Sequence, residues 1–288
     1  MPIATITFGF DPIIRLGPEL AVRWQTVALA AVIALVLAWS GIVARRIGLR
    51  PDDLLSIVIG AVPGAIILGR LAWIAAHPGV VPLDLYAWLD PLLGGFDLSA
   101  AVVGGIASGA FIAALLGAPV GRWAHVLAVP LLLALGGGKL SMILGGSGQG
   151  LPTDVQWATA FVGPGPWGSL AASAPSHPAQ AYEGLATLAL ALVLMVGFGV
   201  GAAGKGDGRL LMGAVAAWAF VRAAVSVTWR DPVVLEPFGT AGWVAVIVGF
   251  VCVATAVALV LMGRRRGTAR SADGDDVDWP DPEARPSF

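Results

Sequence analysis

Residues 241–263 read AGWVAVIVGFVCVATAVALVLMG, an apolar run that contains no charged residue. A helix needs about 20 apolar residues to cross the core of a bilayer, so this run predicts a membrane-spanning helix. Six further stretches of similar length and composition precede it, at 24–44, 54–76, 99–118, 124–144, 179–200 and 209–228. The sequence therefore predicts an all-α integral membrane protein with seven transmembrane helices.

The overall composition agrees with this class. Of the 288 residues, 57% are hydrophobic and 12% are charged, which is too apolar for a soluble globular protein. No basic stripe exists outside short clusters next to the predicted helices, so we expect no nucleic-acid partner. One cysteine, Cys252, and three scattered histidines give no basis for a disulfide framework, a metal centre or another cofactor.

Glycines in two of the predicted helices have the spacing that allows close helix packing. Gly105 and Gly109 lie four residues apart in the third stretch, and Gly60 and Gly64 do so in the second. Small residues at this spacing let two membrane helices approach closely, and we interpret both pairs as packing surfaces.

The basic residues predict the orientation. Positively charged loops stay cytoplasmic, and four segments on one side carry ten basic residues: Arg45, Arg46, Arg50, Arg122, Lys205, Arg209, Arg264, Arg265, Arg266 and Arg270. The opposite side carries Arg15, Arg23 and Arg230 among several acidic residues. We therefore expect the N-terminus outside and the C-terminus in the cytoplasm.

This topology divides the chain into three parts. Residues 1–23 form an external N-terminal arm, and they lack the basic start of a cleavable signal peptide. Residues 24–263 form the membrane domain, with a long external loop over 145–177. Residues 264–288 form an acidic cytoplasmic tail, which is nearly free of apolar residues after Gly267 and is expected to be disordered.

Four charged residues lie inside the predicted spans rather than at their first or last position: Arg70, Lys139, Glu183 and Arg222. Placing one charge in the membrane costs about 2.5–3.5 kcal/mol, so such residues indicate a functional site. Their positions along their helices place all four in the outer half of the bilayer. Three cations with one carboxylate suit an anionic ligand such as a lipid phosphate; the alternative is that they are structural ion pairs and snorkelling side chains.

Several short motifs occur in an order typical of one known family. The chain carries Phe10-Asp11-Pro12, Leu16-Gly17-Pro18, Gly69-Arg70, Gly94-Gly95, the run HPAQAYE at 177–183, and Arg222 followed by Arg230-Asp231-Pro232. Over about 10–262 it resembles the prolipoprotein diacylglyceryl transferases. These are seven-helix bacterial membrane enzymes that move diacylglyceryl from phosphatidylglycerol to the lipobox cysteine thiol of prolipoproteins at the outer leaflet.

The resemblance implies a multi-pass protein of the bacterial cytoplasmic membrane, with phosphatidylglycerol and a prolipoprotein as its partners. It implies catalytic roles for Lys139, His177 and Arg222. Lipid or anion binding would involve these residues: Arg70, Lys139, Gln180, Tyr182, Glu183, Arg222 and Arg230.

The chain also departs from the family pattern. Where the family signature reads Gly-Arg-x-Gly/Ala-Asn-Phe-apolar-Asn-x-Glu-x-x-Gly, residues 138–150 read GKLSMILGGSGQG, and the whole chain contains no asparagine. Ser99-Ala100-Ala101 replaces His-Gly-Gly, Gln25 occupies the position of a tyrosine, and Ser226 that of a glutamate. The anion-holding cations are retained, whereas the means of deprotonating a thiol is not evident.

The sequence leaves three hypotheses for the function. The protein is a working diacylglyceryl transferase, or a non-catalytic homologue that binds anionic lipid, lipoprotein or another membrane protein. A small transporter fits less well, because the sequence lacks an inverted repeat and paired broken helices.

Overall fold

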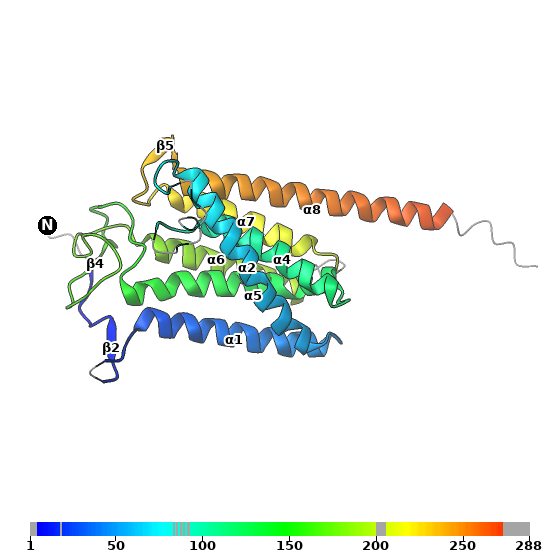
Figure 1. Cartoon of the computed structure of the whole chain (residues 1–288), viewed down its shortest axis with the longest axis horizontal. Coiled ribbons are helices and arrows are strands. Elements are labelled where there is room, and N and C mark those ends of the chain that lie inside the picture. Colours follow the sequence, from blue (N-terminus) through cyan, green and yellow to red (C-terminus); the bar gives the residue numbers. More distant parts are fainter. Residues whose placement is uncertain are drawn as a thin grey trace, which may run out of the picture.

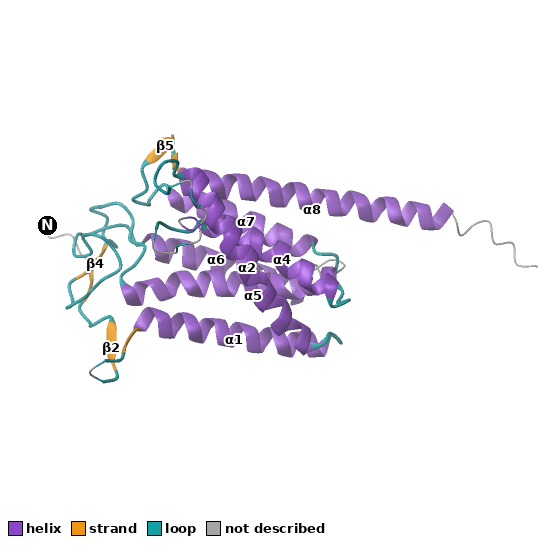
Figure 2. Cartoon of the chain, viewed as in Figure 1, coloured by secondary structure: helices purple, strands orange, loops and turns teal. Residues whose placement is uncertain are grey.

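The computed structural model describes residues 5–17, 19–82, 84, 86, 88, 90, 93–199 and 206–272 (Figures 1 and 2). Seven helices in this part of the chain are long and apolar enough to cross a membrane, which confirms the predicted fold class. Their bounds are α1 (Trp24–Arg46), α2 (Pro51–Ala76), α4 (Leu98–Leu115), α5 (Val120–Ser141), α6 (Ala179–Gly199), α7 (Arg209–Ser226) and α8 (Thr240–Ala272).

Local sequence explains where two of these helices begin. Pro51 occupies the first turn of α2, where its missing N–H costs no hydrogen bond, and Asp52 and Asp53 complement the helix dipole there. Asp97 caps α4, since its carboxylate accepts a hydrogen bond of 2.8 Å from the Ala100 N–H. These caps set the ends of the two helices that pack together most extensively.

Helices α2 and α4 pack through the glycines predicted to lie at a helix interface. A Cβ added to Gly105 would lie 3.5 Å from the Ala61 carbonyl oxygen, and one added to Gly109 would lie 3.4 Å from that of Ile57. Gly64 faces Gly104 even more closely. The Ser108 hydroxyl donates to the Ala61 carbonyl across the same interface at 3.2 Å. The packing interpretation of these glycines is confirmed.

The main core lies around α7. Trp218, Val215 and Ala219 are fully buried there and pack with Leu132 of α5 and Cys252 of α8. In the bundle, α7 therefore has α5, α6 and α8 as neighbours, and Arg222 near its C-terminal end reaches Ser99 of α4.

Short strands gather at the end of the bundle opposite to the end of α8 (Figure 2). A parallel pair joins β1 (Ile6–Phe8) to β4 (Thr159–Phe161), and antiparallel pairs join β2 (Ile13–Arg15) to β3 (Ala21–Arg23) and β5 (Val233–Leu235) to β6 (Phe238–Gly239). A 3-10 turn, η1 (Met142–Gly145), follows α5. Phe8 stacks on Phe161 with ring centroids 4.9 Å apart. The N-terminal arm and the 145–177 loop are thus held together at this end.

The structure differs from the sequence prediction at the C-terminal boundary. Helix α8 continues to Ala272, past the predicted end at 263. The arginine-rich segment that follows the apolar run favours helix and contains no proline before 280. This helix overlaps the expected tail of 264–288 over residues 264–272, and residues 273–288 lie outside the described residues. Which end of the bundle faces the outside remains a prediction.

Candidate active site

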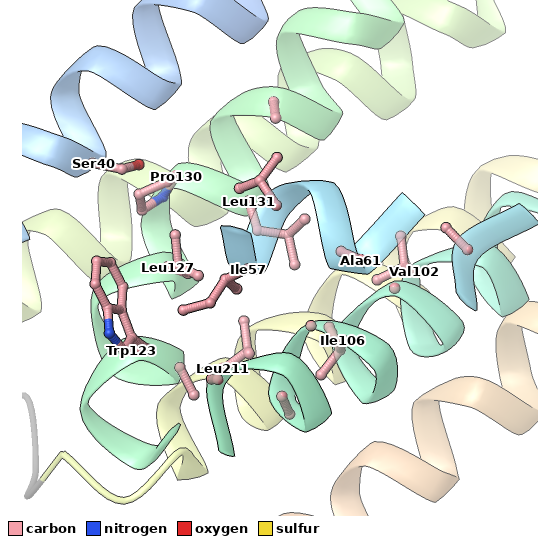
Figure 3. Close-up of a pocket in the computed structure, with 18 of the residues that line it drawn as sticks. Ser40, Ile57, Ala61, Val102, Ile106, Trp123, Leu127, Pro130, Leu131 and Leu211 are labelled. Atoms are coloured by element: carbon pink, nitrogen blue, oxygen red, sulfur yellow. The ribbon is translucent and has the colours of Figure 1, made fainter. Parts of the chain in front are cut away.

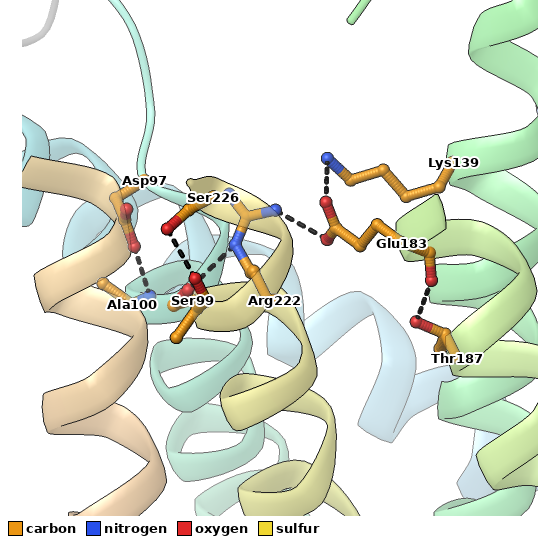
Figure 4. A network of polar contacts seen from close by, with 9 residues as sticks. Asp97, Ser99, Ala100, Lys139, Glu183, Thr187, Arg222 and Ser226 are labelled. Carbon is orange, nitrogen blue, oxygen red and sulfur yellow. Dashed lines mark hydrogen bonds and ion pairs between the residues drawn. The ribbon is translucent and has the colours of Figure 1, made fainter. Parts of the chain in front are cut away.

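A buried cluster of charges joins α5, α6 and α7, and we call Lys139, Glu183 and Arg222 the ion-pair cluster (Figure 4). The Glu183 side chain is fully buried, with Oε1 2.7 Å from an Arg222 guanidinium nitrogen and Oε2 2.8 Å from Lys139 Nζ. Two cations share one carboxylate, so the cluster carries one net positive charge. The structure brings these three of the four predicted intramembrane residues together.

Glycines allow α5 and α6 to approach closely enough for this contact. A Cβ added to Gly136 would lie 3.1 Å from the Gly184 carbonyl oxygen, and a Cβ added to Gly184 would lie 3.1 Å from that of Gly136. Lys139 lies about one turn after Gly136, and Glu183 directly precedes Gly184. The Gly136-Gly137-Gly138 run therefore serves helix packing beside the cluster.

Arg222 is fixed in orientation by further contacts. Its Nε donates to the Ser99 hydroxyl at 3.1 Å, and its guanidinium carbon lies 4.5 Å from the centre of the Trp229 ring. Lys139 Nζ lies 5.5 Å from the same ring. A guanidinium has five N–H donors, and among the described residues Ser99 and Glu183 use only two of those of Arg222. The remaining donors are available to a ligand.

A polar cavity of about 350 Å³ borders the cluster. Lys139 and Arg222 line it, and Arg230 adds a third cation. The other lining residues are Trp73, Ala76, His77, Phe96, Asp97, Gly148, Gln149, Gln180, Trp229, Asp231, Thr240 and Ala241. Two acidic residues therefore face the same space as the cations, which the sequence alone did not indicate.

Two buried amides in this cavity have polar atoms without a hydrogen-bond partner among the described residues. Gln180 is 2% exposed, and neither atom of its amide makes a hydrogen bond. Gln149 donates through Nε2 to the Thr159 carbonyl at 2.9 Å, while its Oε1 accepts nothing. Unpaired buried polar atoms are costly, so both amides are suited to contact a polar ligand. Gln180 was predicted to bind lipid, and the cavity places it where it can do so.

Asp97 lies at the edge of the same cavity. Burial raises the pKa of its carboxyl above the ordinary value, although the hydrogen bond from Ala100 and the charge of Arg222 oppose this rise.

A second cavity, of about 400 Å³, lies between α1, α2, α4 and α5 (Figure 3). Side chains such as Ile57, Val102, Ile106 and Leu131 line it, and Ser40 is its polar exception. The Ser40 hydroxyl is already satisfied, since it donates to the Val36 carbonyl at 2.7 Å. This cavity has the character of a site for hydrocarbon.

Arg70 does not join the ion-pair cluster. Its guanidinium donates to the backbone carbonyls of Trp88, Asp90, Leu93 and Gly95 at 2.6–3.1 Å. It is 5% exposed and is not among the residues that line the polar cavity. The observed role of Arg70 is to hold the segment before α4 against α2.

Three other predicted site residues lie near the long loop. These are His177 and Tyr182, at and just after its end, and Arg230, which follows α7. Arg230 lines the polar cavity but donates to Gly150, Leu170 and Ser176, which ties the long loop to the α7–β5 connection. His177 and Tyr182 lie side by side, with Nδ1 3.4 Å from the phenol oxygen, and neither lines the polar cavity.

Two of the positions that depart from the family pattern contact each other, and two others contact neighbouring residues. Ser147, at the position of the signature glutamate, donates to Gln25 Oε1 at 3.0 Å, and Gln25 is at the position of the tyrosine. Ser99, at the position of the histidine, accepts from Arg222. The Ser226 hydroxyl instead donates to the Ala223 carbonyl at 2.7 Å. The replacements are compatible with a packed site, but none of these side chains is a strong base.

The fold and the site define a seven-helix membrane protein with a charged cavity at one end of the bundle. A family model described as prolipoprotein diacylglyceryl transferase matches residues 12–261. The chain belongs to this family, which confirms the resemblance drawn from its motifs.

Curated relatives share this assignment. A phosphatidylglycerol–prolipoprotein diacylglyceryl transferase of Mesorhizobium japonicum is 27% identical over 64% of this chain and 66% of its own length. One from Methylocella silvestris is 28% identical over 66% of this chain and 70% of its own length. One from Symbiobacterium thermophilum is 33% identical over 44% of this chain and 48% of its own length. The matched regions cover 66%, 70% and 48% of the lengths of these relatives, respectively.

Sequence reasoning missed several residues of the cavity. His77, Asp97, Gln149 and Trp229 come from the ends of helices or from loops, and only the fold brings them to the cluster. Asp97 carried a detectable signal, because an aspartate directly before an apolar helix is typical of an N-cap.

Proposed function

We propose that this protein transfers the diacylglyceryl group of phosphatidylglycerol to the cysteine thiol of a prolipoprotein. The ion-pair cluster is the observation that carries this proposal, because it presents a net positive charge to a polar cavity within a membrane protein. The names of the curated relatives support the same reaction. We further propose that the cavity faces the outer side of the bacterial plasma membrane.

The cluster suits the departing glycerol phosphate. Arg222 retains N–H donors beyond those used by Ser99 and Glu183, and a guanidinium can bind two phosphate oxygens at once. Lys139 adds a second positive charge 2.8 Å from the shared carboxylate. Charges held in place within a water-poor site stabilise developing negative charge without reorganising, which is how such a cluster would accelerate the transfer.

The two cavities together match an amphipathic lipid. The two cavities border consecutive residues of the chain, since Asp97 lines the polar cavity and Leu98 lines the apolar one. A phospholipid would place its headgroup beside Arg222 and an acyl chain among Ile57, Val102 and Ile106. Gln149 and Gln180 would supply hydrogen bonds to the headgroup.

A second candidate is a non-catalytic homologue that binds phosphatidylglycerol or a lipoprotein. The replacements at Ser99, Ser147 and Ser226 favour it, because they remove a histidine and two glutamates that the family pattern carries. Binding needs the cations and the apolar cavity, whereas transfer also needs a proton acceptor.

The test is transfer by purified protein in liposomes that contain phosphatidylglycerol, with a lipobox peptide as acceptor. We expect the wild-type protein to modify the peptide and to support lipoprotein maturation in cells depleted of their own transferase. A well-inserted protein that retains phosphatidylglycerol but fails both assays would contradict transfer and support the second candidate.

Lipid binding is tested separately. We expect Arg222→Ala to reduce the amount of phosphatidylglycerol that co-purifies, measured by mass spectrometry, by about tenfold, since a charged hydrogen bond contributes about 1.5–3 kcal/mol. Arg209→Ala, on the same helix but away from the polar cavity, is the matched control and should retain the lipid. Unchanged retention in Arg222→Ala would show that this arginine has a structural role only.

A further inference from the structure

His77 occupies a position that the family pattern does not assign. It follows the last residue of α2 and lines the polar cavity together with Lys139 and Arg222. All three histidines of the chain lie in the described residues. His77 lines this cavity, whereas His125 lines a separate one and His177 does not line the polar cavity. The position of the signature histidine is Ser99, which contacts Arg222 of this cavity, and the cavity itself contains the His77 imidazole.

The contacts of the His77 ring determine which nitrogen can accept a proton. Nδ1 lies 2.9 Å from the Trp73 carbonyl oxygen. A carbonyl oxygen only accepts hydrogen bonds, so Nδ1 must donate its proton in this contact. In a neutral imidazole Nε2 then carries the free lone pair and acts as the acceptor.

The ring is also held in place by packing. It stacks on Trp73 with ring centroids 4.4 Å apart and an interplanar angle of 17°. Trp73 in turn lies against Gly94, whose φ of +113° favours glycine, and against Gly95, where a Cβ would lie 2.9 Å from the indole nitrogen. The Gly94-Gly95 pair therefore provides the space that seats Trp73 beneath His77.

From this geometry we propose that His77 is the general base that deprotonates the acceptor thiol, a role that rests on the proposed function. The cysteine S–H proton moves to Nε2 as the sulfur attacks the glyceryl carbon that bears the phosphate. The C–S bond forms as the C–O bond breaks, and glycerol phosphate leaves with the electron pair beside Arg222 and Lys139. The imidazolium then releases the proton to water. The charged groups that share this cavity with His77 are Asp97, Lys139, Arg222, Arg230 and Asp231.

The experiment measures single-turnover transfer from phosphatidylglycerol liposomes to a lipobox peptide. General bases contribute about 10²–10⁴-fold to a rate, so we expect His77→Asn to slow transfer by about 100-fold or more while phosphatidylglycerol still co-purifies. His125→Asn, outside the polar cavity, is the matched control and should keep the wild-type rate. Added imidazole should restore part of the activity of His77→Ala, which loss of a merely structural side chain would not allow.

The outcomes separate this proposal from the proposed function. If the wild-type protein transfers lipid and His77→Asn remains within twofold of it, the base is not His77 and the transferase function stands. If His77→Asn loses activity but imidazole does not rescue His77→Ala, a structural role replaces the proposed one. If the wild-type protein transfers no diacylglyceryl group in phosphatidylglycerol liposomes, whereas a curated relative does so in the same assay, the proposed function fails and the assignment of His77 fails with it.

Discussion

At the scale of single residues, Glu183 determines the charge balance of the site. It is fully buried and binds both Lys139 and Arg222. Removing a shared partner leaves two cations uncompensated, whereas removing one cation leaves a neutral pair. The effects of the two kinds of substitution should therefore differ.

We expect Glu183→Gln to destabilise the folded protein by about 3–5 kcal/mol, the usual cost of breaking a buried ion pair. Lys139→Met leaves Arg222 paired with Glu183 and should cost about 1 kcal/mol. Thermal unfolding of both variants in the same detergent measures the difference. Equal losses would contradict the view that Glu183 is the shared centre of the cluster.

The pH dependence of stability provides a test of Asp97. Burial raises the pKa of this carboxyl, so its ionised form is disfavoured in the folded state. The resulting cost is present above the raised pKa and disappears as the pH falls below the ordinary value of about 3.9.

Asparagine can cap α4 as aspartate does and carries no charge. Asp97→Asn should therefore have the higher melting temperature at pH 7, with the gap narrowing as the pH is lowered towards 4. Parallel melting curves across this range check the prediction. A lower melting temperature for Asp97→Asn at pH 7 would show that the carboxylate, through Arg222, stabilises the fold.

The sequence predicted the ion-pair cluster because the position of a residue along a membrane helix indicates its depth in the bilayer. Depth along a helix can be read from the sequence, and depth correctly grouped Lys139, Glu183 and Arg222. The direction in which a side chain points and the course of the loops cannot be read in this way. Arg70 has a similar depth, yet it binds the carbonyls of the segment before α4.

At the scale of elements, the α2–α4 interface depends on backbone contact between glycines. A side chain at Gly64 would meet the Gly104 carbonyl, which cannot move aside as a flexible side chain can. Gly64→Ala should therefore cost about 1–3 kcal/mol, the usual cost of overpacking.

Gly213→Ala on α7 is the matched control. A Cβ at Gly213 would meet nothing within 4 Å, and alanine favours helix by up to about 1 kcal/mol over glycine. Melting temperatures should thus fall for Gly64→Ala and stay equal or rise for Gly213→Ala. The same sign of change in both variants would contradict close packing at Gly64.

The helices were easier to predict than the segments between them. A long apolar run suffices to identify a span, and all seven spans were found in this way. The pairing of β1 with β4 joins residues about 150 positions apart, and local pattern contains no information on such a contact. The cavity residues His77, Asp97 and Gln149 lie in or next to such segments.

At the scale of the whole molecule, the seven apolar helices of the described residues predict that α1 begins and α8 ends on opposite sides of the membrane, and the basic residues predict which side is which. In a Cys252→Ala background, a cysteine at Leu170, 86% exposed in the 145–177 loop, should react with a membrane-impermeant maleimide in intact cells. A cysteine at Ile47, 41% exposed between α1 and α2, should react only after the membrane is permeabilised. Cys252 is buried, so its replacement should leave the fold intact. The reverse labelling pattern would place the polar cavity on the cytoplasmic side, where an outer-leaflet transfer reaction could not occur.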